Sequence, residues 1–180
     1  MKPADDLQAL LARDAISTCI ARLARGEDRR DAAMITASYW PDAEVDYGVF
    51  SGDFDAYLAW VVPGSDAIRN TQHVLGQTHI EIEDDIARAE THVVSYHRID
   101  YGQTDHDTCI GGRYLDRLES RGGEWRIANR MMLYDWHQDW GGSIDWSQGI
   151  MGMPLSDERF SGKANGDHSV DFFAGRAERA

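Results

Sequence analysis

Cysteine is scarce in this sequence. The 180 residues include only Cys19 and Cys109, and neither belongs to a CxxC pair. A disulfide scaffold and a thiolate metal site are therefore not expected. Each thiol is predicted to lie buried and reduced among apolar neighbours.

Long apolar runs are also missing. No stretch approaches the roughly 20 apolar residues that a membrane-spanning helix needs. The opening sequence, MKPADDLQAL, does not show the basic-then-apolar pattern of a signal peptide. Together these absences predict a cytoplasmic protein that does not enter a membrane.

Basic charge is in short supply. Lys and Arg total 18 against 31 Asp and Glu, which gives a net charge of -13. This surplus of acid repels phosphate backbones and anionic lipids, so nucleic acid and membrane surfaces are not predicted as partners. It is compatible with a small neutral molecule as the partner.

The usual cofactor and metal motifs are missing as well. No GxGxxG follows a predicted strand, and neither a Walker motif nor a GxSxG elbow occurs. Strand alternation places His73 and His79 on one face, but six residues apart they are separated by about 20 Å. We therefore predict no cofactor and no metal.

The first part of the chain has helical periodicity. Apolar residues at three- and four-residue steps predict a helix over 5–25, with Gly26 just beyond its end. A second helix is predicted over 31–39, ended by Pro41. A short strand or hairpin over 43–52 and a helix over 53–62 follow. The apolar positions of the first helix are Leu7, Leu10, Leu11, Ala15, Ile16, Cys19, Ile20 and Leu23.

Four strands are predicted next, over 69–85, 86–101, 107–120 and 124–137. Helices followed by an antiparallel meander indicate an α+β fold, with a curved sheet wrapped around the helices as a cone whose mouth can hold a ligand. In the first strand, alternation assigns one face to Val74, Ile80 and Ile82 and the other to His73, Leu75, His79 and Glu81.

The pattern changes near residue 138. The sequence predicts one domain over 1–137 and an irregular C-terminal extension over 138–180, rich in Gly, Asp and Ser. The extension also holds several Trp, Met and Phe residues, which a disordered tail would lack. We expect it to pack on its own domain, over the mouth of the cone, or on a neighbouring subunit.

Three polar residues are candidates for chemistry. Asp28 lies in the break between the first two predicted helices, where Asp28 or Asp31 could equally cap the second helix. His73 could be a surface residue or a proton acceptor. Arg130, among apolar neighbours, could hold a substrate oxygen or pair with Asp28 or Glu44.

Three local motifs resemble the SnoaL-like branch of the nuclear transport factor 2-like superfamily. They are GEDRRD at 26–31, TQH at 71–73 and the hairpin GGRYLDRLESRGGEWRIANR at 111–130. Within this branch the chain resembles scytalone dehydratase, hexachlorocyclohexane dehydrochlorinase and bile-acid 7α-dehydratase. It is also similar to the cofactor-free lyases that remove formaldehyde from lignin-derived diarylpropanes.

The resemblance implies catalytic roles for Asp28, His73 and Arg130. His73 would be the base, Asp28 the carboxylate that orients it, and Arg130 a pocket residue. Leu23 stands where the bile-acid enzyme has a catalytic Tyr, so the acid must come from elsewhere. The resemblance also implies a trimer or a dimer. Candidates for the acid and for substrate binding are Tyr47, Tyr96, His97 and Tyr134, with Trp60 for stacking on an aromatic ring.

The resulting hypothesis is a cofactor-independent lyase of aromatic compound catabolism. It would remove water or formaldehyde from a hydrophobic, lignin-derived-type molecule after proton abstraction by the Asp28–His73 pair. An isomerase or cyclase acting on a steroid- or polyketide-like substrate would use the same abstraction. A non-catalytic ligand-binding domain and the small subunit of an aromatic-ring dioxygenase are alternatives that would not need the pair.

Overall fold

The computed structural model describes residues 3–176. The first helix of the N-terminal part, α1, spans Pro3–Asp28 and precedes a six-stranded sheet. The other elements are α2 (Ala32–Thr36), β1 (Tyr39–Asp46), β2 (Ser51–Asp53), α3 (Phe54–Val61), β3 (Ile68–Glu83), β4 (Ile86–Asp100), β5 (Asp105–Arg121), β6 (Glu124–Gly142), η1 (Trp146–Gln148), η2 (Glu158–Phe160) and α4 (His168–Phe173).

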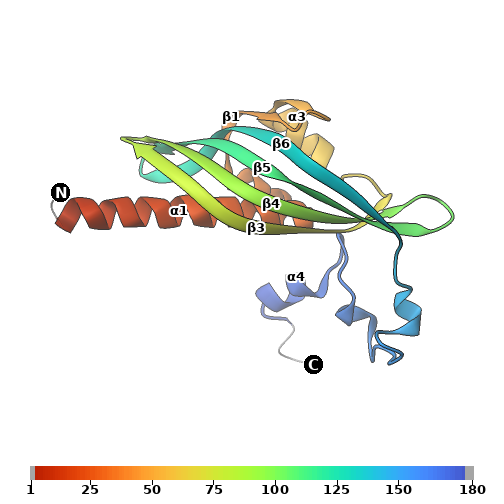
Figure 1. The fold of residues 1–180 in the computed structure, drawn as a ribbon. Coiled ribbons are helices and arrows are strands. Elements are labelled where there is room, and N and C mark those ends of the chain that lie inside the picture. Colours follow the sequence, from red (N-terminus) through yellow and green to blue (C-terminus); the bar gives the residue numbers. More distant parts are fainter. Residues whose placement is uncertain (1–2, 177–180) are drawn as a thin grey trace.

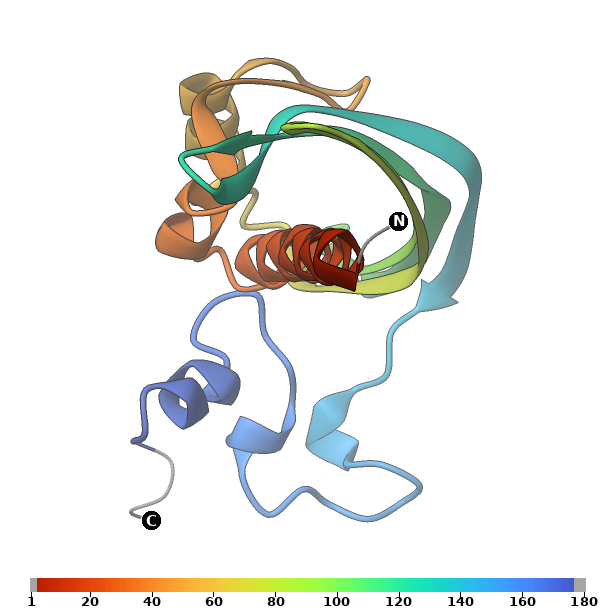
Figure 2. The same ribbon diagram turned by 90° about the vertical axis from the view of Figure 1, so that its left-hand side faces the viewer.

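The sheet has the strand order β2-β1-β6-β5-β4-β3. Neighbouring strands are antiparallel, except that β1 runs parallel to β6. Figures 1 and 2 show the sheet curving around α1, with α3 near the β1 edge. The predicted α+β cone is confirmed.

The core lies between α1 and the concave face of the sheet. Ile16, Ile20 and Leu23 of α1 are buried against the sheet residues Leu118 and Ile127. The α1 residues Leu7, Leu10 and Leu11 are exposed, and Figure 1 shows that the first turns of α1 extend past the ends of the strands. Only the C-terminal part of the predicted apolar stripe is therefore core.

The end of α1 differs from the prediction. The helix continues through Gly26 to Asp28, and Asp31 caps α2 by accepting from the backbone N–H groups of Ala33 and Met34. A Cβ on Gly26 would lie 3.0 Å from Cγ1 of Ile35, so its small size lets α2 pack closely against α1. Gly26 thus serves helix packing rather than helix termination.

The predicted end of the second helix was also wrong. α2 stops at Thr36, and Pro41 lies inside β1. The pairing of β1 with β6 shifts register between Tyr39 and Glu44. Proline lacks an N–H for the sheet ladder, and an irregularity of this kind accommodates it.

The prediction for the faces of β3 holds only over part of the strand. The pairing of β3 with β4 shifts between Leu75 and Thr78, which exchanges the two faces. Val74 is therefore 53% exposed whereas Ile80 is 7% exposed. His73 lies on the concave side and His79 is exposed, so these two histidines do not share a face.

The C-terminal extension begins later than predicted, because β6 continues to Gly142. It then runs below α1 in Figures 1 and 2. Ala164 is 3% exposed and donates its N–H to the carbonyl of Arg69, while Arg29 Nη1 donates to the carbonyl of Lys163 at 2.8 Å. The extension thus packs on its own domain through residues near 164.

Across residues 3–176, none of the helices combines the length and hydrophobicity that crossing a membrane requires.

Candidate functional site

A cavity of about 280 Å³ lies within the cone, beside the C-terminal end of α1. Its lining is mostly aromatic and aliphatic, with a few polar groups, and therefore suits a hydrophobic ligand with polar substituents. The polar lining residues are Glu27, Arg30, Ser65, Thr71, His73, Ser95 and His97, and the aromatic ones are Tyr47, Tyr57, Trp60, Tyr114 and Tyr134.

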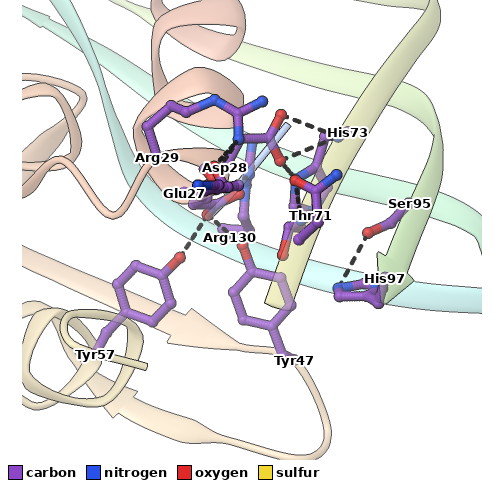
Figure 3. Close-up of polar contacts among 12 residues, drawn as sticks. Glu27, Asp28, Arg29, Tyr47, Tyr57, Thr71, His73, Ser95, His97 and Arg130 are labelled. Atoms are coloured by element: carbon purple, nitrogen blue, oxygen red, sulfur yellow. Dashed lines mark hydrogen bonds and ion pairs between the residues drawn. The ribbon is translucent and has the colours of Figure 1, made fainter. Parts of the chain in front are cut away.

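Asp28 and His73 contact each other at this cavity (Figure 3). The Nδ1 atom of His73 lies 2.7 Å from Oδ1 of Asp28, and the backbone N–H of His73 donates to both carboxylate oxygens at 3.1 Å. A carboxylate can only accept, so in the neutral ring Nδ1 carries the proton and Nε2 keeps its lone pair. Because Asp31 caps α2, the side chain of Asp28 is free to orient the ring of His73.

The environment of His73 shifts its pKa upward. Burial lowers the pKa of the imidazole, but the hydrogen bond to Asp28 and the negative charges of Glu27 and Asp28 outweigh burial. The net effect is a pKa above the usual 6.5. A base of this kind accepts a proton readily near neutral pH.

His97 is the second histidine of the cavity, and its pKa moves in the opposite direction. Its ring centroid lies 6.2 Å from that of His73, and its Nε2 lies 3.4 Å from Oγ of Ser95. Burial, followed by the positive charge of His73, lowers the pKa of His97 to about 4. The ring is therefore neutral at pH 7 and can donate one N–H.

Glu27 is a site residue that the sequence reasoning missed. It lies beside Asp28 on the last turn of α1, and its Oε1 accepts from the hydroxyl of Tyr47 at 2.9 Å and from the hydroxyl of Tyr57. The one available signal was its position next to the proposed catalytic Asp. Tyr57, on α3, carried no signal beyond its aromatic ring.

Arg130 does not line the cavity, which corrects the prediction of a pocket arginine. The side chain is 0% exposed, and Nε and Nη2 donate to the carboxylate of Asp116 at 2.7 and 2.8 Å. The ring of Tyr114 covers the guanidinium at 3.9 Å and separates it from the cavity. The partner is Asp116, directly opposite on β5, rather than Asp28 or Glu44.

The other predicted residues divide into two groups. Tyr47, His97, Tyr134 and Trp60 line the cavity. Tyr96 does not, because it points to the outer face of β4, where its hydroxyl donates to Asp107 at 2.7 Å. The hydroxyl of Tyr134 donates to the backbone carbonyl of Tyr47 at 2.8 Å.

Within the described part of the chain, no three or more His, Cys, Asp or Glu side chains gather in an arrangement that could hold a metal ion.

Comparisons with known proteins agree with this architecture. The family model of the SnoaL-like domain matches residues 8–131. No curated protein matches the chain in sequence. A solved structure of a type 2 hexachlorocyclohexane dehydrochlorinase is similar, with a TM-score of 0.72 and 20% identity over 81% of this chain and 99% of that chain.

Two proteins of Novosphingobium aromaticivorans are also similar in structure. A candidate scytalone dehydratase matches with a TM-score of 0.63 and 18% identity, over 83% of this chain and 96% of that one. The β subunit of a candidate aromatic-ring-hydroxylating dioxygenase matches with a TM-score of 0.59 and 24% identity, over 71% of this chain and 92% of that one. The chain belongs to the SnoaL-like domain family and has the nuclear transport factor 2-like fold.

Proposed function

We propose that the protein is a cofactor-independent lyase that acts on a small aromatic alcohol. The contact between His73 and Asp28 carries the proposal, since it leaves Nε2 of His73 as a base beside an aromatic-lined cavity. The names of two structural neighbours, a dehydrochlorinase and a candidate dehydratase, both describe eliminations and support the reaction class.

In the dehydration form of the reaction, Nε2 of His73 removes a proton from carbon. The electron pair of that C–H bond forms the new double bond, and the C–O bond breaks with its electrons going to oxygen. The imidazolium then gives its proton to the departing oxygen, so water leaves and His73 is neutral again. Asp28 stabilises the imidazolium while it exists, as the acid does in a hydrolase triad.

In the formaldehyde form, His73 removes the proton of a primary hydroxyl group. The O–H electrons form the carbonyl of formaldehyde, and the adjacent C–C bond breaks toward the substrate. The carbon that keeps those electrons then takes the proton back from His73. A lignin-derived type of substrate with an aromatic ring beside this carbon would spread the developing charge.

His97 is the proposed hydrogen-bond donor to the reacting oxygen. Tyr96 faces away from the cavity, and the hydroxyls of Tyr47 and Tyr134 donate elsewhere. The neutral ring of His97 has an N–H to offer, and one such donor can contribute about 3 kcal/mol to stabilising a transition state. Arg130 would act only through Tyr114 and is proposed as a positioning residue.

Isomerisation is the second candidate reaction. It uses the same abstraction by His73 and returns the proton to a different carbon. The single pair of Asp28 and His73 favours it as much as elimination, because one base suffices for both steps. The loss of a small molecule distinguishes the two reactions.

A screen of aromatic alcohols in deuterated water tests this function. Mass spectrometry would detect loss of water, loss of formaldehyde, or deuterium uptake without loss, which identify a dehydratase, a formaldehyde lyase or an isomerase respectively. His73→Ala should abolish the signal. Compounds that bind but undergo no chemical change with the wild-type protein would contradict catalysis and support a binding domain.

A further inference from the structure

Glu27 places a negatively charged hydrogen-bond acceptor on one wall of the cavity. It is 9% exposed, lies among the lining residues and is not needed for the contact between Asp28 and His73. We propose that Glu27, together with Tyr47 and Tyr57, forms a subsite that binds a hydroxyl group of the substrate and excludes anionic substrates. This inference rests on the proposed function for its place in catalysis, but binding alone tests it.

The hydrogen bonds of Glu27 determine which donor and acceptor groups face a ligand on this wall of the cavity (Figure 3). Oε1 accepts from the hydroxyls of both Tyr47 and Tyr57, so neither phenol proton is directed at a ligand. Burial first, and the charge of Glu27 second, raise the pKa of both phenols well above 10, so both keep their protons. Oε2 of Glu27 and the lone pairs of the phenols remain as acceptors.

The arginine that forms an ion pair with Glu27, Arg130, does not line the cavity. Nη1 of Arg130 lies 4.0 Å from Oε1 of Glu27, but the guanidinium is covered by Tyr114 and paired with Asp116. Among the described lining residues, Arg30 is the only Arg or Lys, and its Nη2 donates to the carbonyls of Ser65 and Ile68.

The subsite therefore selects ligands by chemistry. A phenol or alcohol can donate to Oε2 of Glu27, whereas a methyl ether of the same shape cannot. A carboxylate placed beside Glu27 would meet a like charge in a buried position and would be disfavoured there. The expected substrates are neutral hydroxylated aromatic compounds, with the hydroxyl on the Glu27 side and the reacting bond facing His73.

Binding of three matched probes tests the subsite without any turnover. The probes are 4-hydroxybiphenyl, 4-methoxybiphenyl and biphenyl-4-carboxylate, titrated calorimetrically into the full chain. The wild-type protein should bind the phenol about tenfold more tightly than the ether, because a hydrogen bond to a charged group contributes that much. The carboxylate should bind most weakly.

Glu27→Gln replaces the acceptor oxygen by an amide that can donate. This variant should lose the preference for the phenol and bind the carboxylate at least as well as the ether. Tyr57→Phe keeps the carboxylate group of Glu27 and should therefore retain the preference for the phenol. It is the variant to be measured if Glu27→Gln does not fold. Exposed Glu81→Gln is the matched control and should behave as the wild type.

His73→Ala separates this inference from the proposed function. It should abolish turnover and keep the preference for the phenol, because it leaves Glu27 in place. If the wild-type protein binds the phenol and the ether equally, or binds no phenol at millimolar concentration, the subsite is wrong whatever the enzyme catalyses. If Glu27→Gln keeps the wild-type order of affinities, the assignment to Glu27 is likewise wrong.

Discussion

Two neighbouring histidines acquire opposite acid–base properties from their contacts. His73 has a carboxylate on Nδ1 and a second negative charge nearby, so its imidazolium form is stabilised. His97 is buried without such a partner and faces the positive charge of His73 when that ring is protonated. One ring can therefore accept a proton while the other stays neutral and donates a hydrogen bond.

The lowered pKa of His97 predicts a pH-dependent loss of stability. Between pH 6.5 and about 4, the unfolded chain protonates this histidine whereas the folded protein does not. The unfolded state binds more protons, so the free energy of unfolding falls as the pH falls through this window, by about 3 kcal/mol in all. Urea unfolding at several pH values should show a smaller fall for His97→Phe.

The exposed residue His79 provides the control for this measurement. His79→Phe should leave the pH dependence of the unfolding free energy close to that of the wild type, since its side chain is 73% exposed. Unfolding free energies of His97→Phe that run parallel to those of the wild type from pH 7 to pH 4 would show that the pKa of His97 is not lowered.

For individual residues, the sequence predicted some side-chain contacts of the site and missed others. The family motifs suggested that Asp28 and His73 belong together, and the structure shows the contact. Glu27 was not predicted as a site residue, because the first helix was expected to end at residue 25 and the last turn of α1 was therefore not considered. Asp116 could not be found by counting residues back from the 121–123 turn, because that count places Leu115 opposite Arg130. The register shift between Arg117 and Leu118 brings Asp116 there instead.

Among the secondary-structure elements, the β5–β6 hairpin shows how close packing bends the sheet. The pairing of the two strands shifts between Gly111 and Gly112, so that Tyr134 pairs with Gly112 and Trp136 with Gly111. The indole of Trp136 lies directly over Gly111, where a Cβ would be 2.0 Å from Cε2. The two glycines allow this irregularity, which turns the strand around the cavity.

Adding a methyl group at either glycine should destabilise the fold, for different reasons. In Gly111→Ala the new Cβ collides with a half-exposed side chain that can move, at a cost of about 1–3 kcal/mol. In Gly112→Ala it lies 2.2 Å from the backbone carbonyl oxygen of Leu133, which cannot move independently. Urea unfolding should therefore show the larger loss for Gly112→Ala.

The second substitution Trp136→Ala distinguishes the two sites. It should recover much of the stability lost in Gly111→Ala and little of that lost in Gly112→Ala. Equal recovery in both double variants would contradict the packing described for this hairpin.

The four long strands followed from alternating sequence patterns, whereas their irregularities did not. The alternation of apolar and polar residues depends only on the sequence of each strand, so it predicted the strands β3 to β6. The register shift between Leu75 and Thr78 depends on how β3 pairs with β4, so it reversed the predicted position of Val74. Packing between elements also decided where α1 and α2 end.

In the whole molecule, the cone forms the cavity and the extension packs outside it. Every described lining residue of the cavity lies between Glu27 and Tyr134, so no residue of the extension contributes a wall. The extension contacts the outer side of α1 through Arg25, whose guanidinium lies 4.3 Å from the ring centroid of Phe173. Composition predicted that the extension packs, but sequence gave no partner surface for it.

A chain that ends at Gln148 should keep its cavity and lose some stability. Removing the buried Ala164 and the hydrogen bonds near it should lower the free energy of unfolding by about 1–3 kcal/mol. Affinity for an aromatic ligand, followed by the fluorescence of Trp60 and the other tryptophans, should stay within about threefold. A tenfold loss of affinity would show that the extension completes the site, on the same chain or on a second copy.

The proposed reaction depends on His73 as the base and Asp28 as its orienting partner. The most direct test is the turnover of a substrate found in the screen by His73→Ala and Asp28→Asn, with His79→Ala as the surface control. General base catalysis of this kind contributes about 10²–10⁴-fold, so both site variants should lose at least a hundredfold in kcat while remaining folded. The acid limb of the wild-type pH profile should lie above pH 6.5, because the pKa of His73 is raised, and should move down in Asp28→Asn. Turnover by His73→Ala near that of the wild type would contradict the proposed mechanism.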